Sequence, residues 1–175
     1  TGTGFSNLYS AQLIREWPTL AILGLVIAMG SGGSSCSTTG AIKSLRIGVI
    51  FKVLSQEIKK ILLPESSVVV ERFHHIRDVV LEEKQIRSVF LITLCYIFLY
   101  MSGALIGVAC GYPFLEAIFE SVSASANVGL SLGITQPTMP AVLKITYILQ
   151  MWIGRLEFLS IFTLVGFLWA AIKGR

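Results

Sequence analysis

The sequence predicts an all-α membrane protein in which a unit of helix, short re-entrant helix, glycine-containing turn and second helix is repeated. Hydrophobic residues make up 54% of the 175-residue chain and charged residues only 14%, which favours a membrane class over a soluble one. Two apolar runs, residues 89–110 and 141–172, are long enough to cross a bilayer, since about 20 residues span its hydrocarbon core. A third run, residues 20–29, is too short.

Basic residues are concentrated where they indicate membrane topology. The net charge is +4, and nine Lys and Arg residues lie between the short apolar run and the first long one. Because basic segments stay on the cytoplasmic side, residues 43–87 and the C-terminus are predicted to be cytoplasmic and residues 1–18 and 132–140 external. We therefore expect a multi-pass plasma-membrane protein, with no nucleic-acid partner.

The first unit is truncated. The chain opens on a Gly/Thr-rich turn, residues 1–7, without an initiator methionine or a targeting signal, which predicts a fragment of a longer polypeptide. An apolar helix follows over residues 19–29, and then eleven small or polar residues, 30–40. At that depth, backbone facing lipid cannot satisfy its hydrogen bonds, so this segment must face protein or a water-filled cavity.

A basic amphipathic helix is expected next, from residue 41 to residue 63, ending at Pro64. Lys43 is interpreted either as a snorkelling anchor or as a further charge near the polar segment. Residues 65–85 form the main polar excursion and contain a β-branched run, which predicts a short cytoplasmic strand or hairpin.

The second unit is complete. A long helix is predicted over 86–110, followed by a shorter one over 114–126, whose length of about 20 Å makes it a re-entrant half-helix. Its tip, residues 127–135, is a second Gly/Ser/Thr turn. The final helix, 141–172, would extend roughly 48 Å if straight. That length implies a tilt, a break or a protrusion into the cytoplasm.

The two glycine turns are candidate cation-binding segments. Gly4 and Gly129 are each followed by a bulky apolar residue and a serine. Glycine permits the positive φ that turns backbone carbonyls inward, where they can replace the hydration shell of a cation. The C-terminal end of the half-helix before Asn127 would add a partial negative charge. An ordinary helix-connecting loop is the alternative for either turn.

Two charged residues stand out within the apolar segments. Arg155 lies about 21 Å along the last helix, where a charge facing lipid costs roughly 2.5 to 3.5 kcal/mol, so it is expected to face a pore or a partner. The alternative is a structural ion pair with Glu157 or Glu120. Glu120 itself is predicted to be a buried acceptor that supports the second turn.

Four segments resemble a known family, and they occur in the family's order. Residues 119–124 with 127–135 resemble the fourth pore helix and filter of the Trk/Ktr/HKT superfamily of potassium transporters. Residues 3–6 resemble its third filter, 32–43 its intramembrane loop and 152–157 its last pore-lining helix. The chain is thus identified as the C-terminal part of a pore-forming membrane subunit of that superfamily, from the third filter to the C-terminus.

The resemblance implies a fold and a function. Helix, re-entrant pore helix, filter loop and helix would surround a pseudo-fourfold pore that carries K⁺ through a carbonyl-lined selectivity filter. Residues 1–63 would end the third pore repeat, with its filter and broken inner helix; residues 64–85 would be a cytoplasmic connection; and residues 86–175 would form the fourth repeat. No enzymatic activity and no organic cofactor are expected.

The resemblance also implies partners. They are the remaining N-terminal repeats of the same polypeptide, a second copy in a homodimer, a cytoplasmic nucleotide-binding regulatory ring and the lipid bilayer. Alternatives are a Na⁺-permeable or Na⁺/H⁺-coupled K⁺ symporter of the same family and a non-conducting assembly subunit. An intramembrane enzyme that uses Ser or Thr of the loop is disfavoured, because the chain lacks an intramembrane dyad to activate such a nucleophile.

Site residues follow by position from the same resemblance. The filter would comprise Gly2, Thr3, Gly4, Phe5, Asn127, Val128, Gly129 and Leu130, with K⁺ at the carbonyls of Gly4, Asn127, Val128 and Gly129. The gate loop would comprise Gly32, Gly33, Ser34, Ser35, Cys36, Ser37, Thr38, Thr39 and Gly40. Arg155 would be a charge under the filter that hinders cation passage, and Glu120 would support the pore helix.

Overall fold

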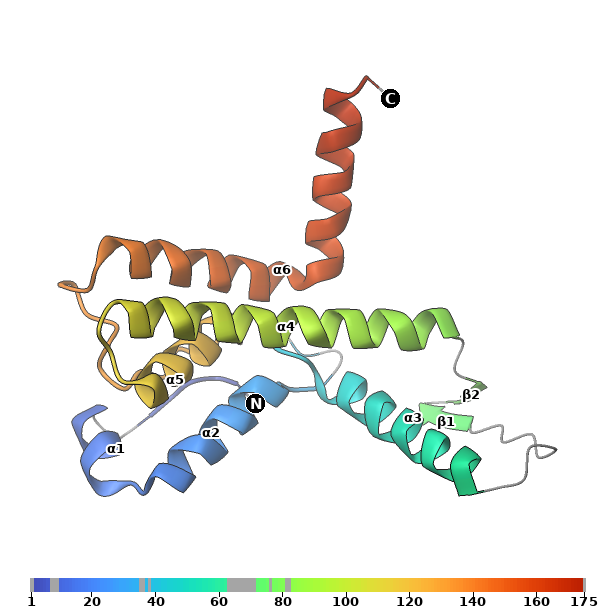
Figure 1. Cartoon of the computed structure of the whole chain (residues 1–175), viewed down its shortest axis with the longest axis horizontal. Coiled ribbons are helices and arrows are strands. Elements are labelled where there is room, and N and C mark those ends of the chain that lie inside the picture. Colours follow the sequence, from blue (N-terminus) through green and yellow to red (C-terminus); the bar gives the residue numbers. More distant parts are fainter. Residues whose placement is uncertain are drawn as a thin grey trace.

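The computed structural model of the chain describes residues 2–6, 10–34, 37, 39–62, 72–75, 77–80 and 83–174. Three residues of the predicted gate loop, Ser35, Cys36 and Thr38, lie outside this described part. Six helices and one two-stranded hairpin make up its regular structure (Figure 1). The predicted all-α membrane class is confirmed, with the hairpin as a small addition.

Three helices form the first unit. They are α1 (Ser10–Glu16), α2 (Thr19–Ser31) and α3 (Ser44–Leu62). The sequence did not predict α1. Pro18 precedes α2 in an extended conformation, which suits a residue whose ring fixes φ and which lacks an N–H. The third helix begins at Ser44, later than predicted, because Ala41 and Lys43 have positive φ values of 73° and 69°.

The polar excursion contains an antiparallel hairpin. Strand β1 (Arg72–His75) pairs with β2 (Arg77–Val80), and Arg72 lies opposite Val80 in the register. The strand or hairpin that the sequence predicted in this segment is therefore confirmed.

The second unit consists of α4 (Glu83–Ala109), α5 (Phe114–Ser125) and α6 (Ala141–Ile172). Both α4 and α6 are long and apolar enough to cross a membrane. With 12 residues, α5 extends only about 18 Å and is too short to do so. The short helix between two long ones agrees with the predicted order of elements.

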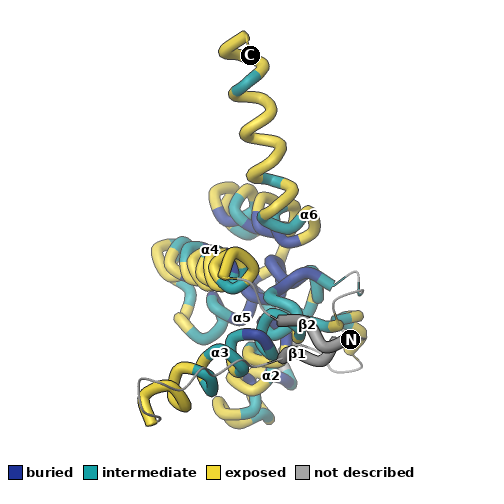
Figure 2. The backbone as a smooth tube through the Cα atoms, turned by 90° about the vertical axis from the view of Figure 1, so that its right-hand side faces the viewer, coloured by how far each residue is buried: buried dark blue, intermediate teal, exposed yellow. Residues whose placement is uncertain are grey.

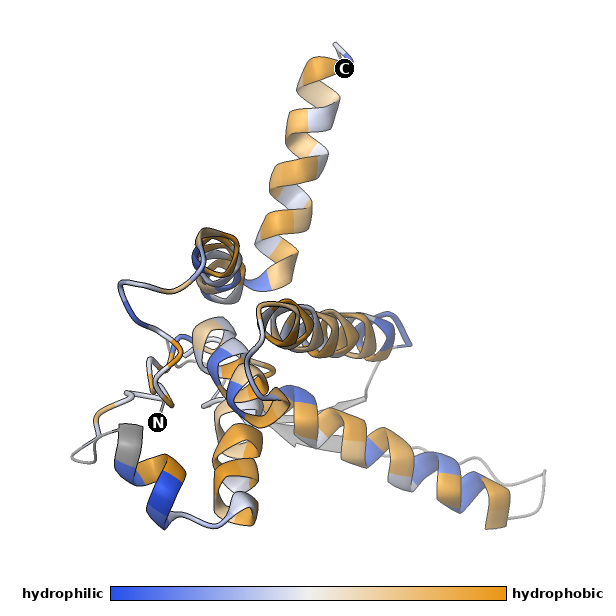
Figure 3. Cartoon of the chain, turned by 60° about the vertical axis from the view of Figure 1, so that its left-hand side comes forward, coloured by the Kyte–Doolittle hydropathy of each residue, from blue (hydrophilic) through white to orange (hydrophobic). Residues whose placement is uncertain are grey.

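The last helix is broken at Glu157, where φ is 60° and ψ is 150°. Its first half lies beside α4, and its second half turns away from the body of the chain (Figure 1). Of the three options that the length of this helix left open, a break is the one found. The second half is almost entirely exposed and mostly apolar (Figure 3), including Phe162, Phe167 and Trp169.

The core lies around α5, which contacts α2, α4 and α6. Figure 2 shows the buried residues gathered there, whereas the outer face of α4 is exposed. Tyr96 of α4 and Phe119 of α5 are fully buried in the larger apolar cluster, together with Met29 at the end of α2. The helix that is too short to span a membrane is thus the one enclosed by its neighbours.

A buried polar network joins these four helices. Gln150 of α6 donates from Nε2 to the carbonyl oxygen of Leu99 at 2.7 Å and to Ser121 Oγ of α5 at 3.0 Å. Ser121 in turn donates to the carbonyl oxygen of Tyr100 at 2.7 Å. The Tyr100 hydroxyl donates to the carbonyl oxygen of Gly30, near the end of α2, at 3.3 Å. Since each group is buried, these bonds specify how the helices align.

Adding a methyl group at Gly103 of α4 should disturb this network. A Cβ there would overlap Gln150 Nε2 and lie 2.5 Å from Ser121 Oγ. The amide would have to move and lose buried hydrogen bonds, so Gly103→Ala should lower the free energy of unfolding by about 1 to 3 kcal/mol. Thermal unfolding of the whole transporter in detergent measures this change.

The matched control is Gly24→Ala in α2, where a Cβ would meet nothing within 4 Å. This variant should be as stable as the wild type or slightly more so, because alanine favours the helix. Equal stability of the two alanine variants would contradict the importance of the network.

Candidate functional site

The two glycine turns lie against each other, backbone to backbone. In the first glycine turn, residues 2–6, Gly4 has a φ of 70°; in the second, residues 127–135, Gly129 has a φ of 87°. A Cβ on Gly4 would overlap the carbonyl oxygen of Val128. Both glycines therefore adopt the left-handed backbone that the sequence predicted, and a side chain at position 4 would separate the turns.

The end of α5 fixes residues 127–130, which we call the inner part of the second turn. The amide of Val128 donates to the carbonyl oxygen of Ser123 at 3.0 Å, and the Ser123 hydroxyl donates to the carbonyl oxygen of Leu130 at 2.6 Å. The side-chain amide of Asn127 donates to the carbonyl oxygen of Met151 in α6 at 3.3 Å. Because the partial negative end of the helix dipole lies at this turn, a nearby cation would be favoured.

Glu120 holds residues 131–135, which we call the outer part of the second turn. This α5 carboxylate is only 3% exposed. Its Oε1 accepts hydrogen bonds from Ser131 Oγ at 2.5 Å, from the Leu132 amide at 3.0 Å and from the Ile134 amide at 3.3 Å. Its Oε2 accepts one from Thr135 Oγ1 at 2.8 Å. One buried side chain thus fixes residues 131–135 through four charge-assisted hydrogen bonds.

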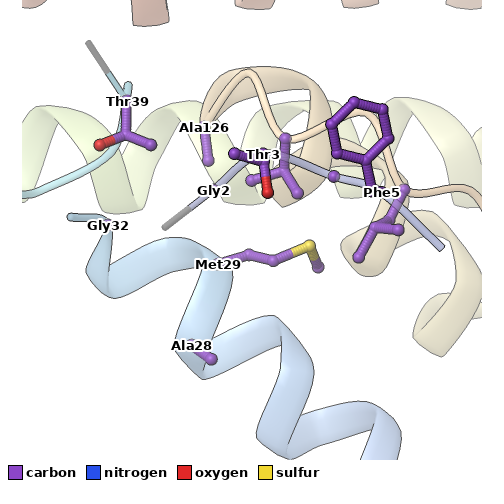
Figure 4. A pocket seen from close by; sticks show the side chains of 11 residues that line it. Gly2, Thr3, Phe5, Ala28, Met29, Gly32, Thr39 and Ala126 are labelled. Atoms are coloured by element: carbon purple, nitrogen blue, oxygen red, sulfur yellow. The ribbon is translucent and has the colours of Figure 1, made fainter. Parts of the chain in front are cut away.

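A cavity of about 190 Å³ lies between the turns and the end of α2. Figure 4 shows Thr3 and Phe5 of the first turn and Met29 of α2 around it. It is lined by both turns, the ends of α2 and α5, and two residues of the polar loop (residues 32–40): Gly2, Thr3, Gly4, Phe5, Ala28, Met29, Gly32, Thr39, Ala126, Val128 and Leu130. Backbone carbonyl oxygens are the kind of ligand that a hard monovalent cation takes in a membrane pore.

The polar loop, residues 32–40, touches both sides of this cavity. A Cβ on Gly2 would overlap the methyl group of Thr39, and a Cβ on Gly40 would lie 2.9 Å from the carbonyl oxygen of Ser125 at the end of α5. Within the loop, Thr39 Oγ1 donates to Ser37 Oγ at 2.7 Å. The loop therefore lies against the first turn and against the helix that carries the second.

Backbone hydrogen bonds join the two ends of the polar loop. The Ile42 amide donates to the carbonyl oxygen of Gly30 at 3.4 Å, and the Ser44 amide donates to that of Gly33 at 3.0 Å. The Ser44 hydroxyl adds a bond to the same oxygen at 3.1 Å. These hydrogen bonds hold the last residues before the loop beside the first residues after it. We call this paired segment, residues 30–33 and 41–44, the loop base.

Arg155 follows a close contact between α6 and α5. A Cβ on Gly154 would overlap the carbonyl oxygen of Ser125 and lie 3.0 Å from Asn127 Nδ2. The helix bearing Arg155 thus packs on the end of α5, directly beside the start of the second turn. Arg155 itself is exposed in this chain.

The carboxylates considered as ion-pair partners of Arg155 have other donors. Glu120 accepts the four hydrogen bonds described above, and Glu157 pairs with Lys43 and Arg46. The sequence did not anticipate this cluster, and Lys43 is not a snorkelling anchor, since its side chain is only 15% exposed. One feature of the sequence could have indicated this cluster. Glu157 is a second charge within the last apolar segment, and basic residues of opposite charge follow the polar loop.

Comparisons with known proteins identify the family of this chain. Residues 4–168 match the TrkH family model, described as cation transport protein. The chain is 36% identical, over 97% of its length, to an uncharacterised cation transporter of Methanocaldococcus jannaschii. It is 28% identical over 93% to the Trk system potassium uptake protein TrkG of Escherichia coli, and 30% identical over 94% to TrkI of Halomonas elongata.

The chain spans about a third of the length of these relatives, covering 34%, 34% and 33% of them respectively. The family match, in contrast, extends over nearly the whole chain and includes Gly4, the polar loop, the second glycine turn and the break of the last helix. The chain therefore belongs to the TrkH family of cation transport proteins.

Proposed function

We propose that the whole transporter containing this chain carries K⁺ across the membrane through a carbonyl-lined selectivity filter. Residues 2–5 and 127–130 would form two segments of that filter, with K⁺ at the carbonyls of Gly4, Asn127, Val128 and Gly129. The observation that carries the proposal is the backbone contact of the two glycine turns beside one cavity. The relatives named as potassium uptake proteins support K⁺ as the ion.

Rigidity of the turns supports selectivity. A carbonyl site discriminates between cations through the number and placement of its oxygens. Glu120 and Ser123 fix the second turn at its outer and inner parts. The backbone of Gly4 lies against the carbonyl oxygen of Val128, and this contact would keep the two sets of carbonyls close together.

The polar loop would act as the gate. Thr39 and Gly40 lie beside the first turn and the end of α5, where a small displacement opens or closes the path below the filter. The residues of the polar loop are small, and irregular backbone at this depth is tolerated only against protein or water. Ser35, Cys36 and Thr38 belong to this proposed gate by position alone, since they lie outside the described residues.

The wider architecture is also part of the proposal. Residues 1–63 would end the third pore repeat, 64–85 would connect the repeats on the cytoplasmic side, and 86–175 would form the fourth repeat, with N-terminal repeats of the same polypeptide completing the pore. The whole transporter would form a homodimer, with the exposed apolar half of α6 facing lipid or the second copy. A cytoplasmic nucleotide-binding ring would regulate the gate.

Two rival functions are less well supported. The family match identifies a transport protein, so an intramembrane enzyme is set aside. A non-conducting assembly subunit would not need two glycine turns of positive φ packed against each other, which this chain has. A Na⁺-permeable channel or a Na⁺/H⁺-coupled symporter would use the same carbonyl geometry, and the names of the relatives favour K⁺.

The first prediction from this proposed function concerns Gly129→Ala. A Cβ at this position would meet nothing within 4 Å, but the φ of 87° disfavours any residue other than glycine. The turn should relax and displace its carbonyls, so the K⁺ over Na⁺ preference in a liposome flux assay should fall severalfold while the protein still folds.

Gly111→Ala is the matched control, because Gly111 has a similar φ of 93° and open surroundings but lies in the turn between α4 and α5. It should cost comparable stability without changing selectivity. Wild-type selectivity in Gly129→Ala, or equal loss in both variants, would contradict the filter assignment.

The second prediction concerns removal of residues 34–37 from the polar loop. If the loop closes the path below the turns, this deletion should raise the basal K⁺ flux of the reconstituted transporter severalfold. The loop base should still form, because its hydrogen bonds involve residues 30, 33, 42 and 44. A folded deletion variant with unchanged flux and unchanged regulation would rule out the gating role.

The third prediction concerns Arg155→Gln, which removes the charge but keeps a polar side chain. A fixed positive charge about 6 Å from a passing cation, at an effective dielectric constant of about 20, repels it by about 3 kcal/mol. That energy corresponds to about a hundredfold in rate as an upper bound, since water and the turn carbonyls reduce it. K⁺ flux should therefore rise, with Arg155→Lys close to wild type.

Thermal stability of the same preparation separates this role from a structural ion pair. If Arg155 instead stabilised a carboxylate of the fold, its neutralisation would lower the thermal stability without raising flux. Lost stability without a gain in flux would show that Arg155 serves the fold rather than the pore.

A further inference from the structure

Glu157 bridges two cations that come from the exit of the polar loop. Its Oε1 pairs with Lys43 Nζ, and its Oε2 lies 2.8 Å from Arg46 Nη2. The three side chains are 27%, 15% and 12% exposed respectively. Arg46 also donates from Nη1 to the carbonyl oxygen of Ile42 at 3.3 Å. Each carboxylate oxygen thus has its own cation, and one cation is tied to the loop base.

Both sides of this cluster lie where the helical backbone is interrupted. Glu157 has a φ of 60° and a ψ of 150° at the break of α6, and Lys43 has a φ of 69° where the polar loop returns to α3. Ala41, which is fully buried, has a φ of 73°. Positive φ is uncommon for residues with a Cβ and persists where the surroundings hold it.

Contacts on either side connect this cluster to the loop base and to the core around α4. On the α3 side, Lys43 lies between Ile42 and Ser44, whose amides close the loop base. On the α6 side, Phe158 packs edge-on against Tyr96 of α4, with ring centroids 4.9 Å apart. Arg155 lies two residues before Glu157. The break of α6 and the loop base therefore form one connected unit.

We propose that Glu157 is a positioning residue that locks the polar loop: its ion pairs with Lys43 and Arg46 hold the loop base against the break of α6. The inference rests on the proposed gating role of residues 32–40. When one partner of a half-buried ion pair is removed, the remaining charged side chains are stabilised only by moving to water or to another partner. That movement would separate the loop base from α6. Movement of the second half of α6 would act on the gate through the same contact.

The lock is tested by K⁺ flux through the whole transporter reconstituted in liposomes. Glu157→Gln should raise basal flux severalfold, toward the level of the variant that lacks residues 34–37. Lys43→Gln, which leaves the Arg46 pair intact, should raise it less and serves as the second variant if Glu157→Gln folds poorly. Exchanging the charges, with Glu157→Lys and Lys43→Glu together, should restore low flux. Failure of either single variant to raise flux, or of the exchange to restore low flux, overturns the lock.

A matched control uses a carboxylate outside the cluster. Glu83 pairs with Arg87 at 3.4 Å on the exposed first turns of α4. Glu83→Gln removes the same charge and should leave basal flux unchanged. A rise in flux equal to that of Glu157→Gln would attribute the effect to net charge and overturn the lock.

Combining variants separates the lock from a general loss of structure. In a protein that already lacks residues 34–37, Glu157→Gln should add nothing, because no gate remains to release. A further rise in that background overturns the lock. If the deletion raises flux but Glu157→Gln alone does not, the lock fails and the gate stands. If the deletion itself leaves flux unchanged, the proposed gate fails, and the lock with it.

Discussion

The rest of the structure depends on how α5 satisfies its backbone where it ends inside the membrane protein. A helix of 12 residues cannot reach the far side of a bilayer, so its last carbonyls and the turn that follows must face protein or water. Enclosure by α2, α4 and α6 meets this requirement. In the proposed filter, carbonyl oxygens of the turn that follows would be the groups that a dehydrated cation needs.

Polar side chains within the apolar core are also hydrogen-bonded or ion-paired, and they connect its helices. Gln150 and Ser121 align α4, α5 and α6, Glu120 holds the outer part of the second turn, and Glu157 joins the last helix to the loop base. Each polar group buried without a partner would be costly. The satisfied network therefore favours one arrangement of the helices, in which both glycine turns reach the same cavity.

Composition and periodicity were sufficient to predict the two long helices, the half-helix, the hairpin and the positive φ of Gly4 and Gly129, because these features are local. Contacts between distant segments were not predictable, including the packing of Gly40 on Ser125 and the ion pairs of Glu157. The length of the last helix left its break open, and Glu157 at the break contacts a cation more than a hundred residues earlier in the chain, which periodicity does not reveal. The short α1 carries no strong periodic signal.

We propose that the two glycine turns are adjacent parts of one cation site. The most direct measurement is an anomalous difference map of the whole transporter crystallised with Rb⁺ or Tl⁺ in place of K⁺. We predict a peak in contact with the carbonyl oxygens of Gly4, Asn127, Val128 and Gly129. Well-ordered turns without a peak between them, in crystals where the same ion is bound elsewhere, would contradict the account.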